Sequence, residues 1–306
     1  MRGPNIGKGA ETNYVKGALF GFSAVLVWAS WIAVTRLGVK TSLTVYDLTF
    51  WRFLTAGLVL APVVWRKGLA LDRLGWGGLG VLVAGAGAPY VLIAASGLRY
   101  APAAQAGALL PGSMPLFVAL LAVLLLKERI TGLRVAGYAL IVLGDLLIVG
   151  GAPATSDQAF GVTLFLVAAS MWAGYAIVLR RSGLESLHAA ALVSTGSALF
   201  YSPAYLVMNG FSAFDAPLRD ILMQALFQGV IVSVCALYLF GQGIAILGAS
   251  AGAAFGALTP ALAALLAIPI LGEVPLAKDW LAIVSVSFGV YLASGGALPA
   301  LRRRLG

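Results

Sequence analysis

Two segments of the chain are copies of each other, and both have the character of a helix packed inside a membrane. Residues 103–129 (AAQAGALLPGSMPLFVALLAVLLLKER) return 145 positions later as residues 248–274 (GASAGAAFGALTPALAALLAIPILGEV). In each copy a small residue or proline recurs at every fourth position, which keeps these residues on one side of a helix. Small residues there allow two helix backbones to approach closely in lipid. The matched residues with an expected structural role are Gly107 with Gly252, Pro111 with Gly256, Pro115 with Pro260, and Glu128 with Glu273.

The composition requires a membrane. Of the 306 residues, 61% are hydrophobic and only 10% are charged, whereas soluble domains carry about 25% charged residues. A spanning helix takes about 20 mostly apolar residues, and the charges and turn signals divide the chain accordingly. We therefore predict an all-α integral membrane protein with ten transmembrane helices near residues 16–36, 44–65, 74–98, 101–126, 132–151, 159–180, 187–208, 219–245, 249–272 and 277–297.

The repeat extends over nearly the whole chain. Trp28 and Ala29 in the first predicted helix correspond to Trp172 and Ala173 in the sixth, and the polar joint at residues 154–160 separates the halves. We predict two five-helix units, 1–153 and 154–306. Because five spans are an odd number, the second unit enters the membrane from the opposite side, which makes an inverted repeat.

The basic residues set the orientation of these spans. With a cytoplasmic N-terminus, fourteen lysines and arginines fall on the inside and five on the outside, as the positive-inside rule requires. We therefore place both termini in the cytoplasm, in a bacterial inner membrane. The basic residues behind the net charge of +9 are spread singly or in short groups between apolar runs. We therefore expect them to set the membrane topology, and we expect no nucleic-acid partner.

The residue types needed for catalysis or metal binding are scarce. His188 is the only histidine and Cys235 the only cysteine, which leaves neither a metal cluster nor a disulfide. We expect no enzyme, no cofactor and no metal. Asp145 is the one carboxylate well inside an apolar run, where it could be a protonatable group. Asp47 and Arg52, five residues apart, could pair with each other or face the loop.

Aromatic, hydroxyl and amide side chains inside the predicted helices are the candidates for substrate binding. Gln242 lies in a stretch of 52 residues without a formal charge, from Ile221 to Gly272. A buried amide without a partner is costly in hydrocarbon, so Gln242 either bonds a neighbouring helix or faces a water-filled cavity. The full candidate set is Ser30, Trp31, Tyr90, Ser96, Gln105, Trp172, Tyr175, Tyr238, Gln242 and Thr259.

Residues 98–131, residues 243–275 and the W-A-S-W opening at residues 28–31 resemble the drug/metabolite transporter superfamily, in its ten-helix EamA group. Within that group the chain is similar to the YddG-type exporters of aromatic amino acids. It departs from the pattern at Lys127, where a glycine is usual before the glutamate, and at Pro111, one turn before Pro115. The resemblance implies a basket of ten helices whose third, fourth, eighth and ninth members line a central cavity. It also implies export from the cytoplasm by alternating access.

We therefore expect an exporter of amino acids and related small metabolites, most of all aromatic amino acids. The alternative is a broad-specificity multidrug or metabolite efflux carrier. The first helix lacks a carboxylate, which argues against a proton-driven antiporter of the small multidrug type. The expected partners are the small-molecule substrate and the lipid bilayer, with no obligate protein partner.

Overall fold

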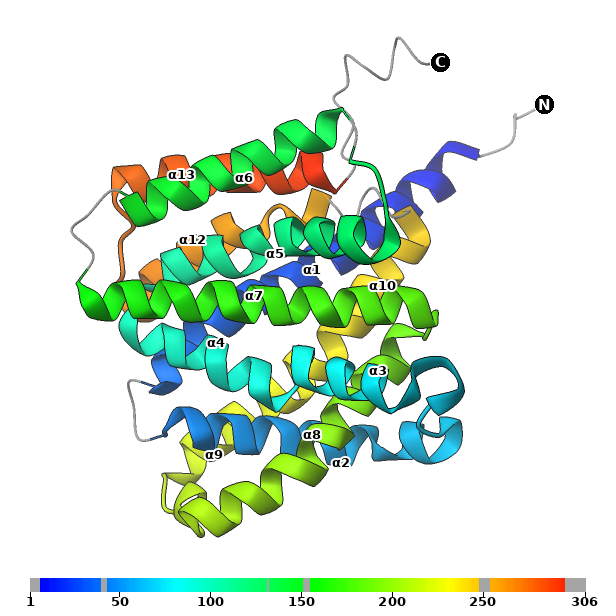
Figure 1. Ribbon diagram of the computed structural model, residues 1–306, viewed down its shortest axis with the longest axis vertical. Helices are drawn as coiled ribbons and strands as arrows, with labels where there is room; N and C mark the ends of the chain where they lie inside the picture. The colour runs from blue at the N-terminus through cyan, green and yellow to red at the C-terminus, as the bar shows by residue number, and fades with distance from the viewer. Residues whose placement is uncertain (1–5, 40–42, 131, 151–154, 248–253, 295–306) are drawn as a thin grey trace.

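The computed structural model describes residues 6–39, 43–130, 132–150, 155–247 and 254–294, and its regular elements there are all helical (Figure 1). The first half contains α1 (Ile6–Val39), α2 (Val45–Lys67), α3 (Leu71–Ala86), α4 (Ala88–Tyr100), α5 (Ala103–Leu126) and α6 (Leu133–Gly150). The second half contains α7 (Ser156–Ser182), α8 (Ser186–Asn209), η1 (Ser212–Phe214), α9 (Leu218–Gln224), η2 (Ala225–Cys235), α10 (Ala236–Leu247), α12 (Thr259–Leu271) and α13 (Ala277–Ala293).

Eight helical stretches in the described ranges are long and apolar enough to cross a membrane: 14–39, 45–67, 71–100, 103–126, 156–182, 186–209, 218–247 and 254–271. They match eight of the ten predicted spans. The other two predicted spans correspond to α6, with 18 residues, and α13, with 17, which are not among the eight. The turn expected near Gly248 lies outside the described residues.

The helices α6 and α13 pack side by side, at the top of Figure 1, with their backbones in contact. A Cβ atom added at Gly137 would lie 2.5 Å from the backbone nitrogen of Ala293, and one at Gly289 would lie 2.7 Å from the carbonyl oxygen of Gly137. The Ser285 hydroxyl donates to the Leu140 carbonyl, 2.9 Å away. Glycines at these positions therefore permit an approach that any larger residue would prevent.

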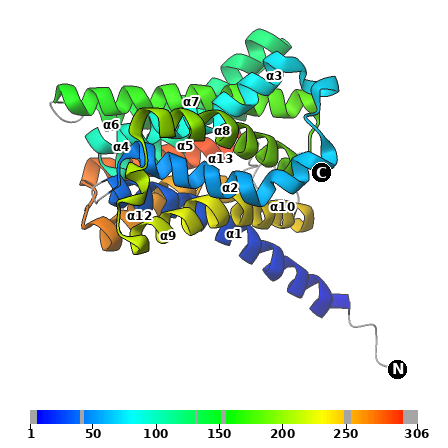
Figure 2. The ribbon, with the colours of Figure 1, turned by 90° about the horizontal axis from the view of Figure 1, so that it is seen from below.

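Equivalent helices of the two halves make equivalent contacts, which Figures 1 and 2 show from two directions. The first helix of one half, α1, packs against α10 and α12, whereas α7 packs against the corresponding α4 and α5. Three further contacts join a helix to its own counterpart: α2 with α8, α5 with α12, and α6 with α13. The two halves are thus arranged about each other in the same way.

The third span of each half is interrupted, which the sequence analysis did not predict. In the first half the chain is extended at Gly87, with φ −93° and ψ −150°, between α3 and α4. In the second half η2 is a π-helix of 11 residues, and its Val232 lies 145 positions after Gly87. Interrupted helices at corresponding places in two repeats mark binding sites in many transporters, and π-helical turns are frequent at functional sites.

Candidate functional site

A glutamate follows the end of both α5 and α12, and a tight turn positions it. Lys127 and Gly272, which end these helices, have the left-handed backbone conformation, with φ of 54° and 68°. The Glu128 amide donates to the Ala122 carbonyl at 3.2 Å, and the Glu273 amide donates to the Ala267 carbonyl at 3.3 Å. Each turn therefore folds its glutamate back toward the helix bundle.

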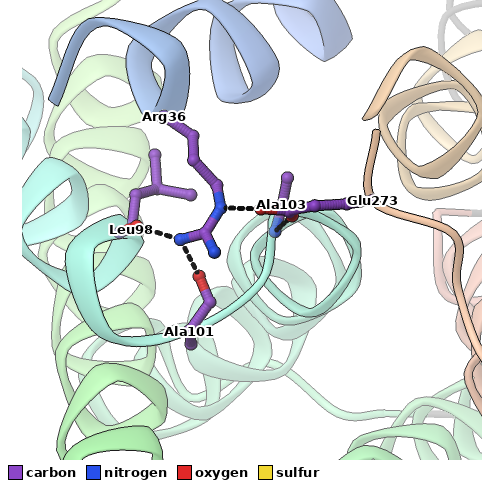
Figure 3. Close-up of polar contacts among 5 residues, drawn as sticks. All are labelled: Arg36, Leu98, Ala101, Ala103 and Glu273. Carbon is purple, nitrogen blue, oxygen red and sulfur yellow. Dashed lines mark hydrogen bonds and ion pairs between the residues drawn. The ribbon is translucent and has the colours of Figure 1, made fainter. Parts of the chain in front are cut away.

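Glu273 takes part in a half-buried polar cluster at the end of α1 (Figure 3). It pairs with Arg36, and its other oxygen accepts from the Ala103 amide at 2.9 Å. The Arg36 guanidinium also donates to the carbonyls of Leu98 and Ala101. The side chains of Arg36 and Glu273 are only 12% and 19% exposed. This cluster therefore ties the end of α1 to α4, to the start of α5 and to the segment after α12.

The equivalent pair lies at the opposite end of the molecule and is open to solvent. Arg180, 144 positions after Arg36, pairs with Glu128, 145 positions before Glu273. These side chains are 51% and 43% exposed. The end of α7, which carries Arg180, is at the right of Figure 1, whereas the end of α1 is at the left. Two matching pairs thus differ in burial.

A cavity of about 330 Å³ lies beside the exposed pair. Glu128, Arg180 and Arg134 line it at the end of the bundle, and Trp172 and Met114 line it farther in. Trp172 precedes Arg180 by eight residues on α7, which is about 12 Å along a helix. The cavity therefore leads from that end of the molecule into the bundle.

Three aromatic side chains are in contact where the cavity reaches Trp172. Its ring centre lies 5.4 Å from that of Tyr90 and 5.0 Å from that of Tyr175. Tyr90 and Tyr175 are buried, and Tyr90 is on α4 directly after the interruption at Gly87. We call Tyr90, Trp172 and Tyr175 the aromatic cluster; the Trp172 ring is tilted by about 50° to the other two, and it supplies an aromatic surface to the cavity.

A polar group around Gln228 adjoins the aromatic cluster, and we call Trp31, Thr35, Arg52, Gln224 and Gln228 the amide–arginine group. The Gln228 carbonyl oxygen accepts from Trp31 Nε1 at 2.8 Å and from Arg52 at 3.1 Å. The Gln228 amide nitrogen donates to Thr35 at 3.2 Å and to Gln224 at 3.0 Å. The two glutamines are buried, and Tyr90 lies within electrostatic reach of the Arg52 guanidinium.

Sequence reasoning missed Gln224 and Gln228. Both lie in the same charge-free stretch as Gln242, and their spacing of four residues puts them on one helix side, which was the available signal.

The two carboxylates left open by the sequence have partners other than Arg52. Asp47 accepts from the Thr44 amide at 2.7 Å, at the start of α2, and also from the Tyr205 hydroxyl. Asp145 accepts from the Ser113 hydroxyl at 2.7 Å. The suggested pairing of Asp47 with Arg52 is therefore absent from the part of the chain that the structure describes.

The remaining candidates are scattered. Ser30 donates to the Leu26 carbonyl on its own helix, and Gln105 accepts from the Gln158 amide at 2.9 Å, which links α5 to α7. Thr259 is buried, Ser96 and Gln242 are half-buried, and Tyr238 is 61% exposed. The structure thus brings together Trp31, Tyr90, Trp172 and Tyr175 and leaves Tyr238 on the outer surface.

The small residues of the repeat also differ in their surroundings. A Cβ atom at Gly107 would lie 2.6 Å from the Cβ of Ala263 on α12, so this glycine permits a close contact between α5 and α12. Pro115 lines the cavity, and Pro260 is buried in the first turn of α12. Nothing lies within 4 Å of such an atom at Gly256, and Gly252 lies outside the described residues.

The family model for the EamA-like transporters matches the chain twice, over residues 15–150 and 159–295. The chain belongs to the EamA-like transporter family. It is a multi-pass membrane protein built from two family repeats.

Two relatives and one solved structure are similar to this EamA-like chain. A riboflavin transporter of Brucella anthropi is 27% identical over 208 residues, which cover 66% of this chain and 70% of the relative. An uncharacterized transporter of Archaeoglobus fulgidus is 27% identical over 279 residues, which cover 88% of this chain and 94% of the relative. A protein of known crystal structure superposes with a TM-score of 0.60 at 22% identity, covering 94% of this chain and 97% of the other, which supports the fold alone.

Proposed function

We propose that this EamA-like transporter exports small organic metabolites, above all amino acids with aromatic side chains, from the bacterial cytoplasm. In this proposal α6 and α13 also cross the membrane, which completes ten spans in two inverted repeats with both termini in the cytoplasm. The protein acts as a carrier and not as an enzyme. The aromatic cluster receives the side chain of the substrate, because burying a ring there removes its apolar surface from water.

The unequal burial of the two repeat-related Arg–Glu pairs is the observation that carries this mechanism. The cavity lies beside the exposed pair, whereas the buried pair holds together four segments at the other end. In the proposed orientation the exposed pair faces the cytoplasm, so the structure corresponds to a carrier open to the inside. This is the state in which an exporter loads its substrate.

Alternating access follows when the two pairs exchange roles. Inverted repeats allow the two halves to interchange conformations about a fixed central site. In the state open to the outside, Arg180 and Glu128 would then be buried in the way that Arg36 and Glu273 are buried here. The carbonyls that correspond to Leu98 and Ala101 are those of Gly243 and Ile246, 145 positions later. They are the expected acceptors for Arg180.

A broad-specificity metabolite carrier is the second candidate. The observation in its favour is the aromatic cluster itself, because aromatic side chains pack against many different apolar rings. The similarity to a riboflavin transporter of Brucella anthropi is compatible with such a site.

Counterflow into proteoliposomes tests the function. Vesicles loaded with unlabelled tryptophan should accumulate labelled tryptophan from outside, and unlabelled phenylalanine should compete more strongly than alanine. The uptake should persist without a pH gradient, because we propose facilitated efflux. Absence of counterflow with every aromatic amino acid would refute aromatic amino acid export, and equal competition by unrelated flat cations would favour the broad-specificity carrier.

A further inference from the structure

We propose that Arg52 binds the carboxylate of the substrate, so that this protein transports aromatic carboxylates whether or not they carry an amino group. This inference rests on the proposed function and narrows its substrate class. It places the substrate between two groups already described, with its charged end at the amide–arginine group and its ring at the aromatic cluster.

The first argument is that the positive charge of Arg52 has no counter-ion among the described residues. Among the described residues no carboxylate forms an ion pair with Arg52, and Asp47, the nearest in sequence, is already bonded to Thr44 and Tyr205. The Arg52 Nε is buried and has no hydrogen-bond partner. A charge inside a membrane protein is costly without a counter-ion, and such residues usually mark substrate paths. A substrate anion would supply the missing partner.

The second argument is that the Arg52 guanidinium is held in place although not all of its N–H groups have hydrogen-bond partners. Its Cζ atom lies 5.6 Å from the ring centres of both Trp31 and Phe53, a distance at which a cation is attracted to an aromatic face. Gln228 is fixed by four hydrogen bonds, and in one of them its side-chain oxygen accepts from a guanidinium nitrogen of Arg52. The planar fork of an arginine matches a carboxylate with two parallel hydrogen bonds. A guanidinium that is held in place and still has an unpaired N–H donor is therefore suited to bind an anion.

A second unpaired donor is linked to the Arg52 guanidinium through Gln228. The amide nitrogen of Gln224 is buried without a hydrogen-bond partner, while the Gln224 oxygen accepts from Gln228. Unpaired buried donors cost free energy, so an oxygen-rich ligand is favoured over a donor. Both glutamines lie where α9 passes into the π-helical η2, the interruption that corresponds to Gly87 in the first half.

The third argument concerns the rest of the substrate. Tyr90 belongs to the same buried cluster as Trp31 and Phe53, the two rings beside Arg52, and it also contacts Trp172. The charged and aromatic groups are therefore part of one packed region. The amide–arginine group and the aromatic cluster contain one arginine and no carboxylate. An ammonium group would therefore meet a positive charge and no counter-ion. We conclude that the carboxylate is required for binding and that the amino group is dispensable.

The test compares three ligands that share one ring: 3-phenylpropionate, L-phenylalanine and 2-phenylethylamine. Binding to the purified full-length protein in detergent is measured by isothermal titration calorimetry. We expect 3-phenylpropionate to bind at least as tightly as phenylalanine, and 2-phenylethylamine to bind at least tenfold more weakly. The Arg52→Gln variant should weaken binding of both carboxylates at least tenfold and leave the amine within twofold. Arg99→Gln, an exposed position in the last turn of α4, is the matched control.

A purely structural role for Arg52 gives a different pattern. If Arg52→Gln keeps the thermal unfolding midpoint of the wild type and still binds 3-phenylpropionate within twofold, the inference is overturned. If that variant does not fold, Arg52→Lys decides, because lysine keeps the charge but not the fork. We expect Arg52→Lys to bind the two carboxylates three- to tenfold more weakly than the wild type does, and still to bind them more tightly than 2-phenylethylamine. A loss of that preference would also overturn the inference.

Counterflow separates this inference from the proposed function. Wild-type protein that exchanges aromatic amino acids but exchanges 2-phenylethylamine equally well would uphold aromatic substrate transport and refute the carboxylate site. Wild-type protein that exchanges none of the three ligands would refute the proposed function itself.

Discussion

Lys127 and Gly272 hold the same position at the ends of α5 and α12, and both have the left-handed backbone conformation. Glycine adopts it freely, whereas a residue with a Cβ atom pays about 1–2 kcal/mol. The sequence departs here from the usual glycine, yet the turn is kept. The turn that places Glu128 beside Arg180 is therefore formed despite the local strain at Lys127.

Replacing Lys127 with glycine should stabilise the protein slightly. The relief of strain is partly offset by the larger backbone entropy of glycine in the unfolded chain, about 0.5–1 kcal/mol, so we expect a net gain below about 1 kcal/mol. The thermal unfolding midpoint in detergent measures it. The reverse change at the matched position, Gly272→Lys, should lower the midpoint. A lower midpoint for Lys127→Gly would contradict the strain argument.

The two arginines of the ion pairs should respond differently to truncation. Arg36→Gln removes a largely buried ion-pair partner of Glu273; breaking a fully buried pair typically costs about 3–5 kcal/mol, and the cost is smaller here because both side chains are partly exposed. Arg180→Gln breaks an exposed pair, and such pairs contribute about 0–1 kcal/mol. We therefore expect Arg36→Gln to favour opening at its end of the molecule.

The rate at which an impermeant maleimide labels Thr259→Cys from outside, in a Cys235→Ser background, measures this opening. It should rise severalfold with Arg36→Gln and remain unchanged or fall with Arg180→Gln. Equal effects of the two changes would show that the pairs are not alternating gates.

At the scale of single helices, the interruptions in the third span of each half decide which residues meet. A π-helical stretch bonds i to i+5 and winds less tightly than an α-helix. The helix sides downstream of η2 therefore cannot be extrapolated with the α-helical period. Tyr238 lies downstream of η2 and is exposed, whereas Gln224, directly before η2, and Gln228, in its first turn, are buried.

The fold was more accessible to sequence reasoning than the site. Hydrophobic length and the internal repeat are carried by many residues at once, so eight spans of the described residues and the presence of two family repeats were predicted. Arg52 depends on orientation: five residues separate it from Asp47, which is about 140° around an α-helix. The two side chains therefore diverge, and only the packing of α1 and η2 against α2 shows where Arg52 lies.

The contact between α5 and α12 should be intolerant of bulk. Gly107→Leu would place its side chain against Ala263 and the Pro260 carbonyl. Overpacking typically costs about 1–3 kcal/mol, so we expect a lower unfolding midpoint and loss of transport. Gly241→Leu is the matched control, because nothing lies within 4 Å of a Cβ atom there, and it should leave both unchanged. Normal stability of Gly107→Leu would show that α5 and α12 can separate freely.

At the scale of the whole molecule, the two halves place equivalent features at opposite ends, and this arrangement fixes a topology that can be measured. In the proposed topology, five spans per half bring the start of α7 to one side of the membrane and the start of α1 to the other. Single cysteines at Asp72 and Ser182, in a Cys235→Ser background, should be shielded from an impermeant thiol reagent outside cells. Cysteines at Asp157 and Asp215 should react. Labelling of Ser182→Cys together with protection of Asp157→Cys would refute the inverted repeat.

The difference in exposure between the two ion pairs also makes the state described here sensitive to ionic strength on one side only. Mobile ions screen charges in contact with solvent over about 8–10 Å at physiological salt, and they hardly affect buried pairs. In this state added salt should therefore weaken Glu128–Arg180 and spare Arg36–Glu273. In right-side-out vesicles, the proposed loading of substrate from the lumen should respond to the electrolyte concentration there and not to that in the bath. The dependence of efflux on the luminal substrate concentration, measured while each electrolyte concentration is varied separately, checks this, and an equal response on both sides would contradict it.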